Sequence, residues 1–167
     1  MKFLKALSRF CNGFRAPDSK QREPTQTPAA HAFVTESGDV ARFIFDKRDL
    51  FANGSPKPKL FQPMWDEETA RFETSVCGLN NVSDSRLWEL GSMIRAKEGK
   101  AAIGAAMLAM PQIASAGLAC EPWPMPDYPE HGVILGWSVD EKDARLSAQQ
   151  DLVSAIASAR VKRKSQT

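Results

Sequence analysis

The first fifteen residues carry apolar side chains at helical spacing. Phe3, Leu7, Phe10 and Phe14 recur every three or four residues, so they fall along one side of a helix. The polar and basic residues Lys2, Lys5, Ser8, Arg9 and Asn12 fall mostly on other sides of that helix. This pattern predicts an amphipathic helical arm over residues 1–15. Three roles are open for the arm: docking on its own domain or a sister subunit, anchoring a partner protein, or lying on a membrane surface.

Residues 16–30 predict a disordered linker. They hold three prolines, many polar residues and no aliphatic side chain larger than alanine. The arm is therefore expected to be tethered to the folded part rather than built into it. We expect a single domain over residues 31–160, followed by a frayed basic tail over 161–167.

Four short apolar segments in the domain predict strands. Residues 40–45 and 71–76 follow turn signals or alternate in polarity, and residues 132–137 form an apolar run between glycines. Residues 59–64 are rich in proline, which favours a strand at a sheet edge. Strands this close in sequence favour antiparallel pairing.

Three further segments predict helices. Ser83 or Asp84 can cap a helix that runs to about Lys97, in which Gly91 indicates close packing or a weak point. Residues 100–110 form a run of small and apolar residues that suits a buried helix, ended or kinked by proline at 111. A last helix is expected over residues 140–160.

These elements predict an α+β fold. We expect a small, mostly antiparallel sheet with about three packed helices, preceded by the tethered amphipathic helix. With 167 residues, 43% of them hydrophobic and 25% charged, the chain is too apolar for a wholly disordered protein. No apolar run reaches the roughly 18–20 residues of a membrane span, so no transmembrane segment is expected.

The net charge of +2 conceals an uneven distribution. Residues 1–30 have six basic and two acidic side chains, whereas residues 31–130 have ten basic and fourteen acidic ones. A protein that binds nucleic acid usually gathers Lys and Arg on one face. Here the positive charge lies toward the two ends of the chain, so the charge alone is weak evidence for nucleic acid.

The sequence lacks complete motifs for several classes of chemistry. Phosphate-binding loops, dinucleotide-binding glycine motifs, H-E-x-x-H and G-x-S-x-G are all missing. The three cysteines, at 11, 77 and 120, have neither disulfide-framework nor metal-ligand spacing. We therefore expect no cofactor and no metal ion, and a cytoplasmic location. Whether the chain is an enzyme stays open.

His131 is the strongest candidate for catalysis. It stands where a proline-rich loop meets a predicted strand, and its ordinary pKa suits acid–base work. Arg42, Lys59 and Arg71 could join it in a metal-free site for phosphate chemistry. The alternative is that His131 holds a loop carbonyl and that the basic residues are solvated. Cys120 could also pair with His131 as a nucleophile.

The proline-rich loop over residues 121–130 also contains Trp123 and Tyr128. These aromatic residues either form an exposed contact for a partner or fix the loop to the domain. Elsewhere in the chain, the acidic run of Asp66, Glu67 and Glu68 beside Trp65 is interpreted as solvated surface.

Several segments together resemble a known group of proteins. They are Arg-Phe-Ile-Phe, Lys-Pro-Lys-Leu-Phe-Gln-Pro, Leu-Trp-Glu-Leu-Gly, Ala-Gly-Leu-Ala-Cys-Glu-Pro and His-Gly-Val-Ile-Leu-Gly-Trp. Over residues 40–150 the chain resembles small uncharacterised bacterial proteins that share such segments. The resemblance implies a bacterial, cytoplasmic setting and draws attention to His131, but it carries no catalytic role.

Two functions therefore follow as expectations. The first is a bacterial cytoplasmic binding or assembly module that docks a partner protein or sister subunit through Phe3, Leu7, Phe10 and Phe14. The second is a small nuclease or nucleic-acid-directed effector that uses His131 with the basic residues. A membrane surface is the third candidate partner.

Overall fold

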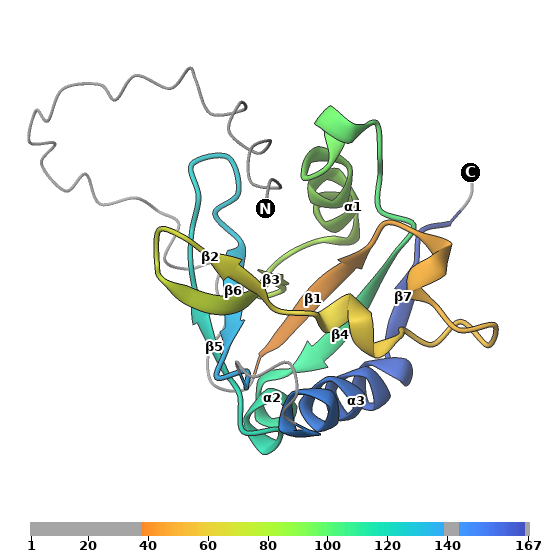
Figure 1. Ribbon diagram of the computed structural model, residues 1–167. Coiled ribbons are helices and arrows are strands. Elements are labelled where there is room, and N and C mark those ends of the chain that lie inside the picture. Colours follow the sequence, from red (N-terminus) through yellow and green to blue (C-terminus); the bar gives the residue numbers. More distant parts are fainter. Residues whose placement is uncertain (1–37, 139–143, 166–167) are drawn as a thin grey trace, which may run out of the picture.

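The computed structural model describes residues 38–138 and 144–165. The predicted arm and linker, and the start of the predicted last helix, lie outside these residues. The α+β class is confirmed, because the described residues form an antiparallel sheet of seven strands with three α-helices (Figure 1). The strands are β1 Asp39–Ile44, β2 Met64–Asp66, β3 Arg71–Gly78, β4 Gly104–Ala109, β5 Ala119–Pro122, β6 His131–Leu135 and β7 Val161–Arg163. The helices are α1 Asp84–Met93, α2 Met110–Ser115 and α3 Ala144–Ser158, with 3-10 turns η2 Lys47–Asp49, η3 Pro58–Phe61 and η4 Ala96–Glu98.

The sheet has the order β5-β6-β3-β1-β4-β7, and β2 pairs with the outer part of β3. Strand β1 pairs with β4 along its full length, from Asp39 to Ile44. By contrast, β1 meets β3 only at Val40 and Ala41, opposite Gly78 and Cys77. The two halves of the sheet therefore diverge beyond Ala41, and we call this divergence the fork.

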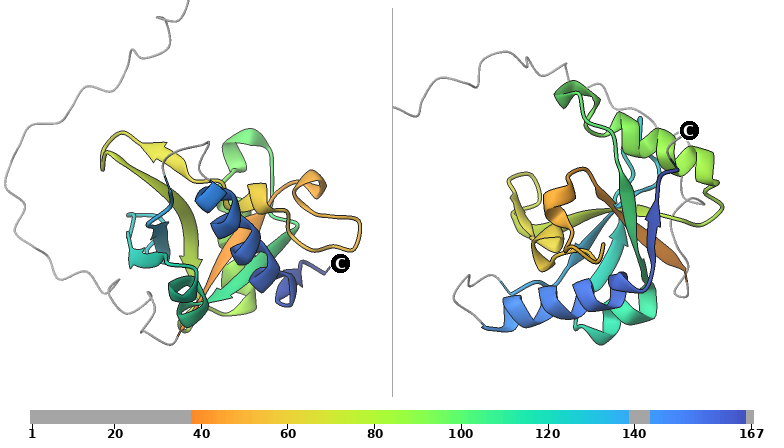
Figure 2. Two further views of the ribbon diagram at one scale, coloured as in Figure 1. Left: turned by 60° about the horizontal axis from the view of Figure 1, so that its bottom comes forward. Right: turned by 90° about the vertical axis from the view of Figure 1, so that its right-hand side faces the viewer.

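Helices cover both faces of the sheet. In Figure 2, α1 lies on one side of the strands, and α2 and α3 lie on the other. Ala41 and Phe43 of β1 pack with Leu87 and Leu90 of α1 in the smaller core cluster. The alternate residues of β1 face the opposite side, where the larger cluster lies.

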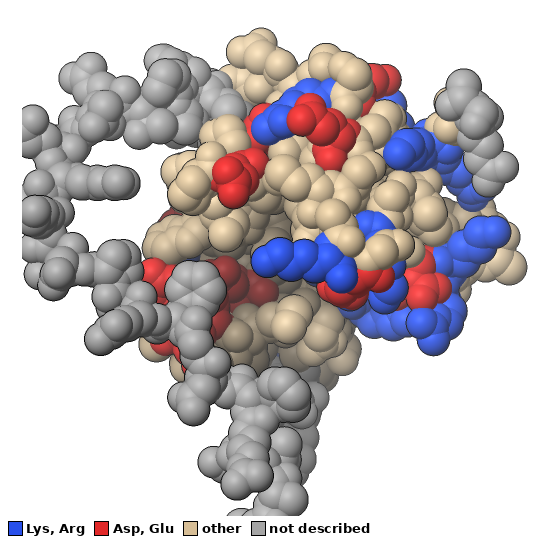
Figure 3. All heavy atoms as spheres, turned by 90° about the horizontal axis from the view of Figure 1, so that it is seen from above, with Lys and Arg blue, Asp and Glu red and all other residues tan. Residues whose placement is uncertain are grey.

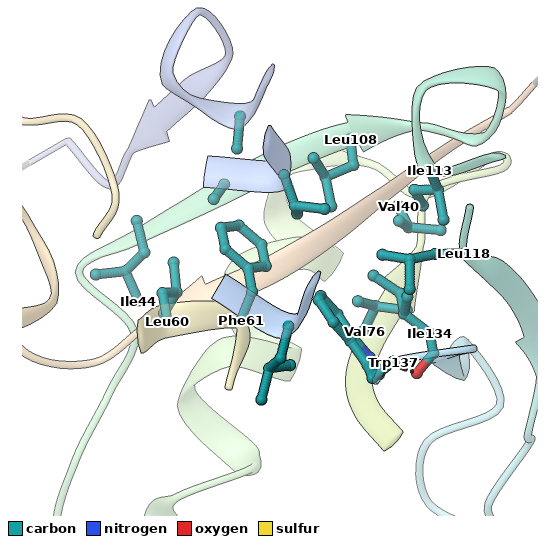
Figure 4. Close-up of a cluster of buried hydrophobic side chains, with 14 residues drawn as sticks. Val40, Ile44, Leu60, Phe61, Val76, Leu108, Ile113, Leu118, Ile134 and Trp137 are labelled. Carbon is teal, nitrogen blue, oxygen red and sulfur yellow. Dashed lines mark hydrogen bonds between the residues drawn. The ribbon is translucent and has the colours of Figure 1, made fainter. Parts of the chain in front are cut away.

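Phe61 of η3 lies at the centre of the larger cluster (Figure 4). It is fully buried, as are Ile44 of β1 and Leu108 of β4. Because η3 also packs against α3, it closes the fork on this side of the sheet. The other members drawn and labelled in Figure 4 are Val40, Leu60, Val76, Ile113, Leu118, Ile134 and Trp137.

The Arg42 side chain lies in the fork and donates hydrogen bonds to two backbone carbonyls there. Its Nε donates to the carbonyl oxygen of Leu60 at 3.2 Å, and its Nη1 donates to that of Ser75 at 2.7 Å. The Ser75 carbonyl belongs to β3, on the side from which β1 has diverged. Arg42 thus supplies hydrogen bonds where the strand ladder stops, and burial lowers the pKa of its guanidinium.

The predicted helix over 100–110 is wrong, because residues 104–109 form the central strand β4. Ala105 belongs to the smaller core cluster, whereas Ala106 and Leu108 belong to the larger one. A strand buried on both faces loses the alternation of polar and apolar residues and reads as a continuous apolar run. Pro111 does not end a helix but lies in the first turn of α2.

Two other segments differ from expectation. The predicted strand over 59–64 is instead η3 followed by β2, since Leu60 and Phe61 are buried side by side and do not alternate. The expected frayed tail is wrong for Val161–Arg163, which pair with β4 as β7. Backbone pairing with a central strand keeps this basic segment in the sheet.

Several local predictions are confirmed. Residues 40–45, 71–76 and 132–137 match β1, β3 and β6 closely, and Ser83 caps α1 by accepting from the Arg86 amide. Gly91 marks close packing, because a Cβ there would lie 2.7 Å from the Ala102 Cβ. Gly117 has the left-handed φ of 70° that is typical of the residue after a helix.

We predict that Arg42→Met lowers the free energy of unfolding by about 2–4 kcal/mol, because two carbonyls in the fork lose a charged donor. Urea unfolding measures the change. Arg48→Met is the matched control, because Arg48 is exposed and its hydrogen bonds go only to Asp46. Equal stability of the two variants would show that Arg42 does not hold the fork.

Candidate functional site

His131 is a buried residue at the start of β6, 7% exposed. Its Nδ1 lies 2.7 Å from the carbonyl oxygen of Trp123, and its ring lies 5.2 Å from that of Tyr128. Tyr128 is buried too, so it does not form an exposed contact with Trp123. Burial raises the pKa of Tyr128. His131 thus holds the proline-rich loop by a carbonyl.

Two of the basic candidates, Arg42 and Lys59, do not converge on His131. Ala41, Cys77 and His131 lie opposite one another across β1, β3 and β6, so they share the α1 face. Arg42, one residue after Ala41, leaves the strand on the other face. Lys59 belongs to η3, which packs against α3, and its Nζ lies 3.0 Å from Asp49. The structure therefore does not bring His131, Arg42 and Lys59 into one cleft.

Cys120 does not pair with His131 either. It lies opposite Ile134 in the β5–β6 ladder and packs against the larger core cluster. Burial raises the pKa of its thiol to about 12, and that of Cys77 to about 11. Neither thiol is therefore a reactive thiolate at neutral pH.

Glu130, next to His131, is a buried charge that the sequence analysis did not single out. Its Oε1 accepts from Arg86 Nε at 2.8 Å, and its backbone carbonyl accepts from the Gly78 amide at 2.7 Å. Burial raises the pKa of Glu130, but the Arg86 hydrogen bonds, a hydrogen bond from the residue's own backbone amide and the Arg86 charge together leave the pKa below its ordinary value. This ion pair joins α1 to the loop before β6, which is a structural role.

Arg71 and Trp123 are two candidates that the structure does bring together. The Arg71 guanidinium lies 5.2 Å from the centre of the Trp123 ring, which is 41% exposed. It also pairs with Glu73 at 3.3 Å and with Glu121 at 3.4 Å. Its Nη2 is buried without a hydrogen-bond partner among the described residues. The Arg71 side chain thus connects the start of β3 to the proline-rich loop.

A pocket of about 280 Å³ lies beside the same hairpin. Trp65 at its edge is 53% exposed and packs edge-on against Phe72 at 5.2 Å. The end of β2 and the turn that follows it carry Asp66, Glu67 and Glu68, which we call the acidic turn, and Ala70 of the same turn lines the pocket. We call the cavity the hairpin pocket; it is lined by Trp65, Ala70, Arg71, Phe72, Leu135, Gly136 and Trp137.

Sequence reasoning missed the hairpin pocket. Its walls come from the β2–β3 hairpin and from residues 135–137 at the end of β6. The hairpin and this segment are more than sixty residues apart in sequence. The only local signal was Trp65 beside the acidic run of residues 66–68, and the sequence analysis interpreted that run as solvated surface. Large apolar side chains exposed near a hollow are typical of a docking surface.

The chain matches no protein-family model, no curated protein and no solved structure. Within residues 38–138 and 144–165, His, Cys, Asp and Glu side chains form no group of three that could hold a metal ion. In the same part of the chain, every helix is too short or too polar to cross a membrane.

We predict that His131→Ala lowers the free energy of unfolding by about 2–3 kcal/mol, because it removes a buried ring and leaves the Trp123 carbonyl unpaired. Asp127→Ala, an exposed position in the same loop, is the control and should unfold like the parent. The midpoint of urea unfolding gives the comparison. A fully stable His131→Ala protein would argue against the structural role.

Proposed function

We propose that this chain is a bacterial cytoplasmic binding module that docks a partner protein or a sister subunit through its N-terminal arm. The observation that carries the proposal is the exposed apolar surface around the β2–β3 hairpin. Trp65 and Met64 are 53% and 70% exposed there, and Trp123 lies nearby above Arg71. Tryptophan and methionine are enriched in protein interfaces, and isolated domains rarely leave them grouped on the surface.

The arm adds the second half of the proposal. Its apolar stripe of Phe3, Leu7, Phe10 and Phe14 has the spacing by which amphipathic helices enter apolar grooves. The predicted linker would let the arm reach a separate molecule. Binding of this kind needs no convergent catalytic groups, which agrees with the scattered positions of His131, Arg42 and Lys59.

We predict that Leu7→Asp with Phe10→Asp in the full chain abolishes assembly, because charges would enter the apolar stripe. Light scattering after size-exclusion chromatography measures the mass, and circular dichroism should show an unchanged fold. Ser8→Ala with Asn12→Ala is the matched control, since it leaves the stripe intact. An unchanged mass and an unchanged set of bound partners in the Asp variant would contradict the proposal.

A second candidate is binding of nucleic acid, and a gathering of basic side chains favours it. In the face drawn in Figure 3, Lys and Arg gather toward one side with some Asp and Glu among them, and a further group of Asp and Glu lies on the other side. The Arg163 guanidinium lies against Gly54, and the Lys164 amide bonds to the Ile103 carbonyl, so the end of β7 adjoins the 46–57 loop. We call this region the basic end; its described residues are Lys47, Arg48, Lys57, Lys59, Arg95, Lys97, Lys100, Arg163 and Lys164.

The basic end also exposes an aromatic ring. Phe51 is half exposed, and Lys57 Nζ lies 5.8 Å from the ring centre. Aromatic rings among basic side chains suit single-stranded nucleic acid, in which bases stack and phosphates pair. Asp46, Asp49 and Glu98 offset part of this charge through ion pairs with Arg48, Lys59 and Arg95.

If the second candidate holds, Lys47→Glu with Lys57→Glu should weaken binding of a labelled single-stranded oligonucleotide at least tenfold at low salt. Fluorescence anisotropy measures the affinity, and added salt should weaken the parent as well. Ala144→Glu with Ala148→Glu is the control, because it adds negative charge at exposed positions in the first turns of α3. Equal affinity of the two double variants, or no binding by the parent, would rule the candidate out.

A further inference from the structure

We propose that residues 32–36, just before the sheet, dock in a pocket beside the N-terminal end of α1, with Phe33 as the side chain that enters it. We call these residues the strap and this cavity the α1 pocket. The inference goes beyond the proposed function and holds whether or not the arm binds a partner. It places the strap on the domain, so that the free part of the linker begins beside α1.

The α1 pocket lies where the described chain begins. It has a volume of about 320 Å³, and Gly38 and Asp39 form part of its wall. The rest of the wall comes from the loop between β3 and α1, from α1 itself, and from strands β4 and β7. A cavity of this size can hold an aromatic ring and part of a neighbouring side chain. The chain therefore enters the domain at the edge of a hollow.

The floor of the α1 pocket is apolar. Leu87 of α1 belongs to the smaller core cluster, and Leu79 and Val82 pack against that cluster. Met107 of β4 also lines the pocket; it is partly buried but is a member of neither core cluster. An aromatic ring in the pocket would extend the smaller cluster over Met107, whose thioether packs favourably against aromatic rings.

The charged side chains that line the α1 pocket already have partners. Arg160 donates to both carboxylate oxygens of Asp39, at 2.8 and 2.6 Å, and Lys162 pairs with Asp84. A further charge brought into the pocket would lose water without gaining a partner of its own. The pocket therefore favours an apolar segment over the arm, which carries four basic side chains.

The strap is the apolar segment that the chain offers at this place. Between Phe14 and Gly38, the only large apolar side chains other than proline are those of Phe33 and Val34. Both lie within the domain that the sequence predicts over residues 31–160. A phenylalanine this close to a folded domain gains free energy by packing against it, whereas the polar linker before it does not.

The length of the chain selects the α1 pocket over the hairpin pocket. Phe33 precedes Gly38 by five residues, which span at most about 18 Å when fully extended. Gly38 itself lines the α1 pocket, so Phe33 can reach it. Gly78, the last residue of β3, pairs with Val40, and the hairpin pocket lies at the other end of this eight-residue strand, roughly 24 Å away.

The same short connection favours the chain's own strap over that of a second copy. With only Thr35, Glu36 and Ser37 between Val34 and Gly38, docking is intramolecular and the effective concentration of the strap at the pocket is high. A strap from another molecule would compete only at high protein concentration.

NMR of selectively labelled methionine methyl groups in the full chain tests the contact. An aromatic ring shifts the resonance of a methyl group that packs against it, so Phe33→Ala should move the Met107 resonance. Phe14→Ala removes the same ring from the arm and is the matched control, which should leave Met107 in place. The Met107 resonance is identified by its loss in Met107→Leu.

Chymotrypsin, which cleaves after phenylalanine, gives a second measurement. Cleavage after Phe33 requires an undocked strap, so a charge in the floor of the pocket, Met107→Glu, should speed it at least about tenfold. Met93→Glu, at an exposed methionine of α1, is the control and should cleave like the parent. Circular dichroism shows whether the variants fold. If Met107→Glu does not fold, the Phe33→Ala spectrum still decides, because this change leaves the described residues intact.

Three results would overturn the inference. The first is a Met107 resonance that Phe33→Ala does not move, and the second is one that Phe14→Ala moves instead, which would place the arm in the pocket. The third is a Phe33→Ala effect that disappears on dilution, which would assign the strap to a second copy. Assembly through Leu7 and Phe10 is measured separately by light scattering, so loss of the strap contact leaves the proposed function standing, and the reverse.

Discussion

The fork between β1 and β3 is the constraint on which the rest of the domain depends. Two adjacent strands pair at only two positions and then separate, so backbone groups and apolar surface would otherwise be left open. Arg42 supplies hydrogen bonds to the backbone carbonyls of Leu60 and Ser75. Phe61 covers the apolar surface by filling the larger core. One inserted turn, η3, supplies both Leu60 and Phe61.

The fork also explains where the charges lie. Strands β1, β4 and β7 continue to the basic end, whereas β3 continues with β2 and β6 to the acidic turn and the hairpin pocket. The net charge of +2 therefore conceals a domain with two electrically different ends.

The sequence predicted those elements whose local pattern matches their burial. Strand β6 lies between glycines, α1 starts at a serine cap, and β1 follows a turn signal, so each was placed nearly correctly. Strand β4 was missed because burial on both faces removes the alternation that marks a strand. Strand β7 was missed because its basic residues resemble a solvated tail until β4 pairs with them.

The site was harder to predict than the fold. His131 was noticed for its place at a loop–strand junction, and that junction is where the Trp123 carbonyl needs a partner. The pairing of Arg71 with Trp123, fifty-two residues apart, depends on how β3 bends and has no local signal. The pocket depends likewise on segments that only the sheet order brings together.

Hydrogen exchange on the full chain at increasing protein concentration tests the central claim most directly. If the arm docks on a sister subunit, amides of residues 2–14 gain protection as the concentration rises; if it docks on a partner protein, they gain protection when that partner is added. An arm that stays unprotected at every concentration and in the presence of every bound partner would contradict the account.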